Sequence, residues 1–527
     1  MASPLWFISV VLSYVSFGVG VGFVSTLAAG LVMPDAASSL EYLDLSHNSL
    51  TVGKLESGDS ANGEMQPIPY TLGNVAHLKL LDLSHNLITG PIPSTLGYLA
   101  NLTQLDLSHN LIIGPIRYIL GNLTHLMQLN LSYNQITGPI LSTLGYLPNL
   151  TQLDLSYNRI SGAIPPTLGG LINLEILSFT SNQISSFIPS ELGSMKSLVE
   201  LHLNENKLKG QIPSSVSNLS YLEDLKLDSN LLQGPIPHEI GNMKSLVRLS
   251  FSNNKLSGFI PSSLSKLSSL NYLYLDSNLL QGPIPGDIGN LKNLVALNFS
   301  TNKLSGLIPS SLSTLSRLIG LYLDSNLLEG PLPIEMENLE ALEYLDFSNN
   351  KLNGPIPSRI GVCYTLQVLS LSNNLINGSI PFEIFSCPTT LNLSHNFIHG
   401  HIPQHDEVTD FYQLYDLDLS YNNLSGMIPE SLSSLGMLNL SYNSLEGPIP
   451  KLLSYSFSPY SFWGNKHLCG DVAGFLQCRK TSGYGSVYRA QLPSGKIVAL
   501  KKLYRREAEV PAFDKSFKNE AKMLSEI

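Results

Sequence analysis

The hydrophobic positions of this chain recur with a period of 24 residues. Each period reads L-x-x-L-x-L-S-x-N-x-[LI]-x-G-x-I-P-x-x-[LI]-x-x-L-x-x, and twelve consecutive intervals between its asparagines have this length. These asparagines are Asn86, Asn110, Asn134, Asn158, Asn182, Asn206, Asn230, Asn254, Asn278, Asn302, Asn326, Asn350 and Asn374. Looser periods, marked by Asn48 before and by Asn396, Asn422 and Asn443 after, bring the total to about seventeen units. The pattern predicts one long repeat array.

Each period combines a strand with a turn. The "LDL" segments alternate at strand period, so that the leucines point inward and the residue between them points to solvent. We expect the asparagine after the strand to be buried and to bond backbone groups of its own and the adjacent coil, forming a ladder. "GxIP" supplies a turn glycine, a buried isoleucine and a proline that fixes the next coil. Because no unit buries its leucines alone, the units stack into a curved array with a parallel sheet on the concave face.

This pattern is the signature of leucine-rich repeats. Its "LxGxIPxxLGxL" half resembles the plant-specific class, and "SFWGNKHLCG" with Cys478 resembles the cap that closes the ectodomains of plant receptor-like kinases. The resemblance covers roughly residues 39–478 and implies an α/β-type solenoid, a plant-specific leucine-rich-repeat superhelix. The family's N-terminal cap is not recognisable, and residues 51–66 lengthen the first interval to 38 residues, as an expected loop insertion.

The N-terminus predicts a secreted chain. The first 34 residues carry no charged side chain, and residues 5–33 are apolar. We predict a signal peptide over residues 1–30, cleaved after Gly30. Because about 20 apolar residues suffice to span a bilayer, an uncleaved anchor is the alternative. The repeat array then occupies residues 31–450 and its cap residues 451–478.

Charge divides the chain near Cys478. The net charge of −10 argues against a nucleic-acid partner. From Arg479 to Ile527, eleven Lys and Arg stand against five Asp and Glu, a balance of +6, which leaves −16 for the preceding residues. This change of sign indicates a domain boundary.

Four cysteines are present. Cys469 and Cys478 lie nine residues apart, and we predict that they close a small disulfide loop in an oxidising compartment. Cys363 and Cys387 occupy equivalent positions in successive units, where we expect buried free thiols.

Residues 479–527 resemble the start of a plant receptor-kinase domain, closest to the receptor-like serine/threonine kinases described as male-discoverer-interacting. "GYGSVYRAQLPSGKIVALKKL" predicts a turn, a strand, a turn and a second strand. The resemblance implies an ATP site in which Gly485 and Val487 belong to the glycine-rich loop, Lys501 contacts the α- and β-phosphates, and Glu520 pairs with Lys501. Only the third of the three loop glycines is present, as Gly485.

We expect this partial kinase N-lobe to be inactive. No catalytic loop, metal-binding D-F-G or activation loop follows it, so no catalytic residue is assigned, and ATP and magnesium are implied by the family alone. About 47 residues also fall below the size that usually sustains a core. Family members place a membrane helix between cap and kinase, whereas here the two adjoin, so whether the chain is an enzyme stays open.

Ten N-x-[ST] sequons are expected to accept glycans if the chain is secreted, although the repeat itself readily generates "NLS" and "NLT". They are Asn101, Asn122, Asn130, Asn149, Asn218, Asn298, Asn377, Asn392, Asn423 and Asn439.

The middle units depart from consensus at charged and aromatic positions expected to face the concave side. These are Glu200, His202, Glu205, Asp224, Lys226, Arg248, Tyr272, Tyr274, Tyr322 and Asp324. Mixed charged and aromatic residues on a rigid surface suit recognition of an extended peptide; the alternative is a solvated face. His85 and His109 recur in adjacent units, but no carboxylate or cysteine completes a metal site with them, so we assign no metal.

The sequence therefore predicts the ectodomain of a plant receptor-like kinase that binds a peptide or a partner ectodomain, including a possible co-receptor, through its concave face. The alternatives are a serine/threonine receptor kinase represented by an incomplete sequence, and a soluble decoy receptor. We expect the secretory pathway, with the plasma membrane implied by the family and the apoplast if the chain is as written. Membrane association requires an uncleaved N-terminal segment or a restored membrane helix.

Overall fold

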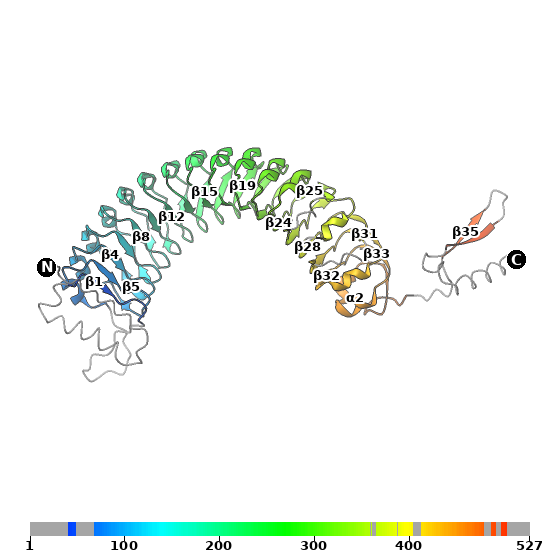
Figure 1. Cartoon of the computed structure of the whole chain (residues 1–527), viewed down its shortest axis with the longest axis horizontal. Helices are drawn as coiled ribbons and strands as arrows, with labels where there is room; N and C mark the ends of the chain where they lie inside the picture. The colour runs from blue at the N-terminus through cyan, green and yellow to red at the C-terminus, as the bar shows by residue number, and fades with distance from the viewer. Residues whose placement is uncertain are drawn as a thin grey trace, which may run out of the picture.

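The computed structural model describes residues 40–48, 68–358, 360, 365–386, 388–403, 413–478, 486–491 and 497–502. The repeat array forms a curved stack of coils, and its long parallel sheet lines the inner side of the arc (Figure 1). This sheet has 17 strands, which confirms the expected number of units and the expected sheet on the concave face. The predicted signal segment, the loop insertion over residues 51–66, Cys363 and Cys387 lie outside the described residues.

Each strand of the long sheet has three residues, and its central side chain is buried. The strands are β1 (Tyr42–Asp44), β2 (Leu80–Asp82), β4 (Gln104–Asp106), β6 (Gln128–Asn130), β8 (Gln152–Asp154), β10 (Ile176–Ser178), β12 (Glu200–His202), β14 (Asp224–Lys226), β16 (Arg248–Ser250), β18 (Tyr272–Tyr274), β20 (Ala296–Asn298), β22 (Gly320–Tyr322), β24 (Tyr344–Asp346), β26 (Val368–Ser370), β28 (Thr390–Asn392), β30 (Asp416–Asp418) and β32 (Met437–Asn439). Neighbouring strands pair in parallel without slippage, as in Leu225, Leu249 and Leu273. Equivalent residues of successive units therefore form straight rows across the sheet.

The asparagine ladder forms as expected. Asn254 Nδ2 donates to Phe251 O at 3.2 Å and Ser252 O at 3.1 Å in its own coil, and to Leu227 O at 3.0 Å in the preceding coil. Its Oδ1 accepts the backbone N–H of Leu232 at 2.9 Å. A buried amide thus bonds four backbone groups, and some of these, such as Ser252 O, also have a backbone partner in the neighbouring coil. A buried backbone group left without any partner would cost about 1–3 kcal/mol.

Short strands that follow the ladder asparagines form lateral sheets, which the sequence reasoning did not predict. They are β3 (Thr89–Gly90), β5 (Leu111–Pro115), β7 (Gln135–Thr137), β9 (Ser161–Gly162), β11 (Gln183–Ile184), β13 (Lys209–Gly210), β15 (Leu231–Gly234), β17 (Lys255–Gly258), β19 (Leu279–Gly282), β21 (Lys303–Gly306), β23 (Leu327–Pro331), β25 (Lys351–Gly354), β27 (Leu375–Ile376), β29 (His399–His401), β31 (Asn423–Gly426), β33 (Ser444–Pro448) and β34 (His467–Cys469). The expected turn glycine closes many of them in the left-handed region, as at Gly258 with φ of +83°.

The other half of most coils carries one 3₁₀ helix rather than an α-helix. A proline precedes most of them, and four or five residues do not suffice for a stable α-helix. The 3₁₀ helices are η2 (Tyr70–Asn74), η3 (Ser94–Tyr98), η4 (Tyr118–Asn122), η5 (Ser142–Tyr146), η6 (Pro166–Gly170), η7 (Ser190–Ser194), η8 (Ser214–Asn218), η9 (His238–Asn242), η10 (Ser262–Lys266), η11 (Gly286–Asn290), η12 (Ser310–Thr314), η13 (Ile334–Asn338), η15 (Phe382–Phe385), η16 (Glu430–Ser434) and η17 (Pro459–Phe462).

The central coils alternate in pairs, with a second period of 48 residues. Lysines of every other coil donate to the carbonyl of the last residue of the next 3₁₀ helix: Lys196 Nζ to Asn218 O at 3.0 Å, Lys244 Nζ to Lys266 O at 2.8 Å, and Lys292 Nζ to Thr314 O at 3.3 Å. Serine and aspartate alternate in the turn after the strand, and the serine hydroxyl donates to the next coil's carboxylate in the pairs Ser252–Asp276 and Ser300–Asp324. Adjacent coils are therefore complementary rather than identical.

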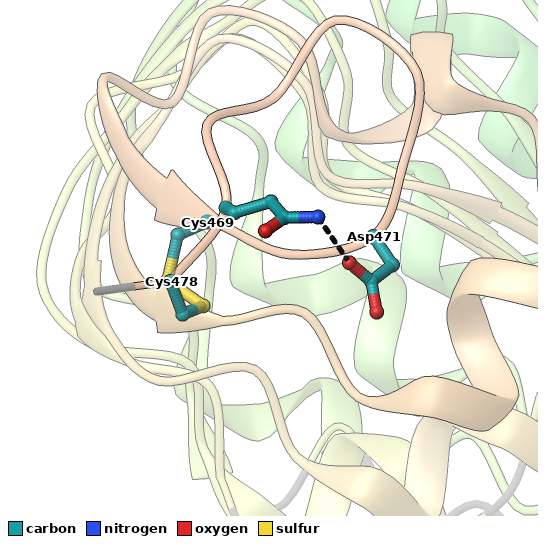
Figure 2. Close-up of a disulfide and its surroundings, with 4 residues drawn as sticks. Cys469, Asp471 and Cys478 are labelled. Atoms are coloured by element: carbon teal, nitrogen blue, oxygen red, sulfur yellow. Dashed lines mark hydrogen bonds between the residues drawn. A yellow bond between two sulfur atoms is a disulfide. The ribbon is translucent and has the colours of Figure 1, made fainter. Parts of the chain in front are cut away.

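The cap continues the array. After helix α2 (Lys451–Ser456) and η17, Asn465 takes the place of a further ladder residue: its Nδ2 donates to Leu440 O and Phe462 O, both at 2.9 Å, and its Oδ1 accepts Leu445 N–H at 3.0 Å. The predicted disulfide between Cys469 and Cys478 is confirmed, with a Cα–Cα distance of 4.8 Å (Figure 2). Inside its loop, Gln477 Nε2 donates to Asp471 Oδ1 at 3.3 Å.

Beyond the cap, β35 (Ser486–Gln491) and β36 (Ile497–Lys502) pair antiparallel. The two strands expected in this segment are therefore present, and Val487 lies opposite Lys501. Gly485 and Glu520 lie outside the described residues. Among the residues that the structure describes, no helix combines the length and apolar character needed to cross a membrane.

Candidate functional site

Two rows of outward side chains line the concave face. The first row contains the residues that begin each strand and the second row those that end it, and both stand in register across the sheet. Eight of the ten predicted contact residues occupy these rows, between β12 and β22. The rows place them next to one another because neighbouring parallel strands lie about 4.8 Å apart.

Four of the predicted residues form an ion cluster across β12 and β14. Asp224 Oδ2 lies 2.9 Å from Lys226 Nζ and 3.3 Å from His202 Nε2, and Glu200 Oε2 lies 3.8 Å from the same imidazole nitrogen. Burial raises the pKa of Asp224, but hydrogen bonds from His202 and Lys226 and their charges outweigh it, so that the pKa lies below its ordinary value. The charges of this cluster are therefore largely compensated within it.

Arg248 is different because it stacks on an aromatic ring. Its guanidinium carbon lies 4.7 Å from the centroid of the Tyr272 ring. Within the described part of the chain, no carboxylate forms an ion pair with it. The rings of Tyr272 and Tyr274 lie 6.3 Å apart, and burial raises the pKa of Tyr274, although the charge of Arg248 opposes this shift. This part of the face presents a cation held on an aromatic support.

Two small residues follow in the first row, Ala296 and Gly320. The ring of Tyr322 lies over Gly320, where a Cβ would come within 2.8 Å of Tyr322 Cε2. Burial raises the pKa of Tyr322, with smaller contributions from Tyr344 and Tyr274. The face therefore has a stretch of small side chains bordered by tyrosines on both sides.

Glu205 and Asp324 do not lie on strands, which corrects their predicted placement. Strand alternation ends with the third residue of each strand, and the backbone then turns. Glu205 precedes a ladder asparagine, has φ of +56°, is exposed, and accepts a hydrogen bond from Ser181 Oγ. Asp324 accepts hydrogen bonds from Ser300 Oγ and Ser325 Oγ. Its carboxylate is thus used within the array.

The residues that precede the ladder asparagines form an edge row beside the concave face. All have φ between +52° and +56° in the described coils, from His47 to Tyr442. Near the N-terminus their rings stack continuously, with centroid distances of 4.1–4.2 Å, in the order His47, His85, His109, Tyr133, Tyr157. His395, Tyr421 and Tyr442 stack in the same way near the C-terminus.

Between these two stacks the edge row is small and polar, except for Glu205. Its residues there are Ser181, Glu205, Ser229, Asn253, Ser277, Thr301, Ser325, Asn349 and Asn373. This segment coincides with the non-consensus part of the concave face. The edge row therefore has shorter side chains at the coils that carry Arg248 and the tyrosines. An extended ligand can reach the concave face there without crossing a row of stacked rings.

Sequence reasoning missed three residues of this surface: Ala296, Gly320 and Tyr344. The available signal was their strand position, since each precedes a buried leucine as Tyr272 does. Small residues were passed over because they offer no chemistry of their own. Ala296 leaves room beside the tyrosines, and Gly320 leaves room for the ring of Tyr322.

The ten sequons divide by position. Six are exposed outside the long sheet: Asn101, Asn122, Asn149, Asn218, Asn377 and Asn423. The other four end strands of the long sheet and are half-buried on the concave face: Asn130, Asn298, Asn392 and Asn439.

Comparisons with known proteins agree with this architecture. Two sequence profiles described as leucine rich repeat match the chain, one over residues 69–112, 118–160, 148–208 and 220–280, the other over residues 39–59, 293–315, 341–363, 365–387 and 413–435. A search among curated proteins found no match.

Several solved receptor structures are similar to the chain. The Arabidopsis receptor kinase HAESA, solved with the peptide hormone IDA and the co-receptor SERK1, is 33% identical with a TM-score of 0.73, over 83% of this chain and 75% of the matched chain in that structure. The plant peptide hormone receptor RGFR1, solved with RGF2, is 33% identical with a TM-score of 0.65, over 77% and 74% of the two chains. PEPR1, solved with AtPEP1, is 31% identical with a TM-score of 0.57, over 77% and 71%.

Proposed function

Because the chain belongs to the leucine-rich-repeat receptor-like proteins, we propose that it is a receptor ectodomain that binds an extended peptide on its concave face. The binding surface runs from Arg248 to Tyr344 across strands β16 to β24. Similar receptors were solved with peptide hormones, and one of them also with a co-receptor. A peptide ligand and a partner ectodomain are accordingly the proposed partners.

The observation that carries this proposal is that Arg248 stacks on an aromatic ring instead of pairing with a carboxylate. A guanidinium held over Tyr272 without a carboxylate partner in the described residues is pre-organised for an external anion. The adjoining tyrosines offer large, rigid contact areas at a low cost in side-chain entropy. The small side chain of Ala296 lets a ligand backbone approach the sheet between Tyr272 and the Tyr322 ring, which covers Gly320. Together these features suit a peptide with an acidic group next to a compact apolar residue.

The ion cluster of Glu200, His202, Asp224 and Lys226 has a lesser role in this proposal. Its charges compensate one another, and a ligand would have to break those pairs to use them. We assign it to the border of the binding surface. Glu205 and Asp324, which lie in turns, are left out of the contact set.

The proposal also assigns roles to the two ends of the chain. We propose that the apolar N-terminus directs the chain into the secretory pathway, to the cell surface or the apoplast, and that the segment around β35 and β36 is an inactive kinase remnant without ATP or magnesium. A soluble decoy that competes for the same peptide uses the same concave surface. The two roles differ in membrane attachment, which cell fractionation measures.

Selection of peptides followed by calorimetry tests the binding proposal. A displayed library of random 12-residue peptides is selected against the chain secreted from plant cells, and the best binder is titrated into variants. We expect that Tyr272→Ala combined with Tyr274→Ala, and separately Arg248→Gln, weakens binding by about 1–3 kcal/mol. Because surface residues seldom carry stability, the Tm should stay nearly unchanged.

Gln128→Ala is the matched control. Gln128 occupies the first row of the concave face, as Tyr272 does, but in the consensus part of the array. Asp106 also lies in the consensus part of the concave face, but it would be a poor control because it accepts hydrogen bonds from Asn130 and Ser108, so its replacement could affect stability. Equal losses in the control and in the tyrosine pair, or a Tm that falls together with the affinity, would contradict the proposed surface.

A further inference from the structure

A cavity of about 500 Å³ lies where the last strand of the long sheet meets the cap. Its walls are Tyr421, Tyr442, Tyr460 and Trp463, and its polar lining is Asn439, Ser441 and Ser461. This volume falls in the range of about 300–1,000 Å³ that accommodates small organic ligands. The site is distant from the proposed peptide surface, which ends at β24.

The cavity has aromatic walls because the cap replaces a full coil with smaller elements. Gly464 occupies the place of the next edge-row residue, with φ of +77°, and a Cβ there would come within 2.8 Å of Tyr442 Cα. The ring stack of Tyr421 and Tyr442 therefore has no further ring beyond it. Trp463 instead packs edge-to-face against Tyr460 at 4.4 Å and stays 44% exposed.

Asn439 combines this cavity with a glycosylation sequon. It begins the sequon Asn439-Leu440-Ser441, and both of its polar residues line the cavity. Asn439 Nδ2 donates one hydrogen bond, to Asp418 Oδ2 at 3.2 Å, and its Oδ1 accepts from Ser441 N and Ser441 Oγ. The second hydrogen of the amide is not used by any of these bonds. A glycan can replace that hydrogen while all three bonds remain.

We propose that Asn439 carries an N-linked glycan whose first sugar packs into this cavity as part of the folded structure. In the attachment step the amide nitrogen attacks C1 of a lipid-diphosphate-linked oligosaccharide. The C1–N bond forms, the C1–O bond to the lipid diphosphate breaks, and one amide proton leaves to a base of the transferase. The remaining N–H is the donor to Asp418. On folding, the apolar face of the sugar covers aromatic surface of Trp463 and Tyr442.

Asn130 provides a natural comparison within the same chain. It is also a sequon at the end of a long-sheet strand, its Nδ2 donates to Asp106 Oδ2 at 3.0 Å, and its Oδ1 accepts from Ser132 N and Ser132 Oγ. Full coils continue on both sides of it, with Gln104 and Gln152 as the first-row neighbours of Gln128 in its own strand. Asn130 therefore has the same hydrogen bonds as Asn439 and lacks the aromatic cavity of the cap.

Tryptophan fluorescence gives a specific readout. Trp463 and Trp6 are the two tryptophans of the chain, so a Trp6→Phe background isolates Trp463 whether or not the N-terminus is cleaved. In this background, secreted from plant cells, we expect Asn439→Gln to increase quenching of Trp463 by iodide at least twofold. We expect Asn130→Gln to leave the quenching unchanged. Ser441→Ala and Ser132→Ala remove the same two sequons but keep both asparagines. We expect the first variant to increase quenching of Trp463 and the second to leave it unchanged.

Glycopeptide mass spectrometry separates this inference from the proposed function, on which it rests for entry into the secretory pathway. Occupancy at the exposed Asn101 and Asn149 reports that entry. Occupancy of Asn439 together with shielding of Trp463 supports the proposal. An unoccupied Asn439 in a chain glycosylated at Asn101 and Asn149, or an occupied Asn439 with unshielded Trp463, overturns this inference alone. A chain without glycans at all three sites overturns both.

Discussion

At the level of single residues, the position before each ladder asparagine requires a left-handed backbone conformation. The seventeen residues from His47 to Tyr442 that precede ladder asparagines in the described coils are held near φ of +54°, and none of them is glycine. In the cap, Gly464 holds the equivalent place with φ of +77°. This conformation costs about 1–2 kcal/mol for most side chains, and asparagine tolerates it best because its short polar side chain bonds locally. Thr301 is β-branched and therefore unfavourable there.

Thr301→Asn should therefore stabilise the array by about 1 kcal/mol. The change leaves the preceding sequon Asn298-Phe299-Ser300 intact. Urea denaturation at equal protein concentration measures the effect. Asn349→Thr, at the equivalent position two coils on, is the reciprocal variant and should lose a similar amount. Losses in both variants would show that side-chain contacts, rather than backbone conformation, dominate at this position.

The ladder asparagines and inward leucines could be predicted from the sequence because their roles are local and repeated in every unit. Glu205 and Asp324 were misplaced for a related reason. Alternation was extended past the strand, into the left-handed residue and the residue before it. The repeat alone did not predict that Arg248 stacks on Tyr272 or that the charges around His202 pair with one another. Both depend on which side chains face each other across neighbouring coils.

At the level of strands, the N-terminal end of the long sheet carries a row of like charges. Asp44, Asp82 and Asp106 are direct neighbours in β1, β2 and β4. Burial raises the pKa of Asp82, and its two aspartate neighbours add to the shift. Because the folded-state pKa lies above the unfolded value, ionised Asp82 costs stability at neutral pH. That cost disappears as the pH falls below about 3.8.

Asp82→Asn should thus stabilise the fold at pH 7 by about 0.2–1 kcal/mol, the usual size of a cross-strand pair, and by nothing below pH 3.8. An asparagine can still accept the Ser84 N–H, as Asn130 accepts that of Ser132. Thermal unfolding across this pH range checks the prediction. Asp346→Asn, whose strand neighbours are Tyr322 and Ser370, should change little. A gain at Asp82 that persists at low pH would exclude the charge explanation.

The hairpin of β35 and β36 yields a second prediction for an element. Two of the three glycines of the phosphate-binding loop are absent, because Lys480 and Ser482 stand in their places and only Gly485 remains. ATP with magnesium should therefore leave the Tm unchanged, since stabilisation requires binding to the native state. Differential scanning fluorimetry measures this directly, with Lys501→Ala as the matched variant. An ATP-dependent rise in Tm that is lost in Lys501→Ala would refute an inactive remnant.

For the whole molecule, the cap closes the C-terminal end of the array by continuing the geometry of the coils. At the C-terminal end Asn465 extends the ladder into the cap, and the disulfide between Cys469 and Cys478 constrains the loop beyond it. The sequence predicted this disulfide from spacing and family resemblance. It did not predict that the cap repeats the ladder geometry or leaves an aromatic cavity, because both depend on how the shortened elements pack against the last full coil.

The pairing of coils also determines how such an array can change in length. Lysines bond to the next 3₁₀ helix in every other coil, and serines face aspartates between adjacent coils. Duplication or loss of 48 residues between η7 and β25 preserves each of these partnerships, whereas 24 residues would place similar coils side by side. Gene rearrangements in this segment should therefore survive selection in multiples of two coils, so that descendants with longer or shorter arcs differ from this chain by an even number of units.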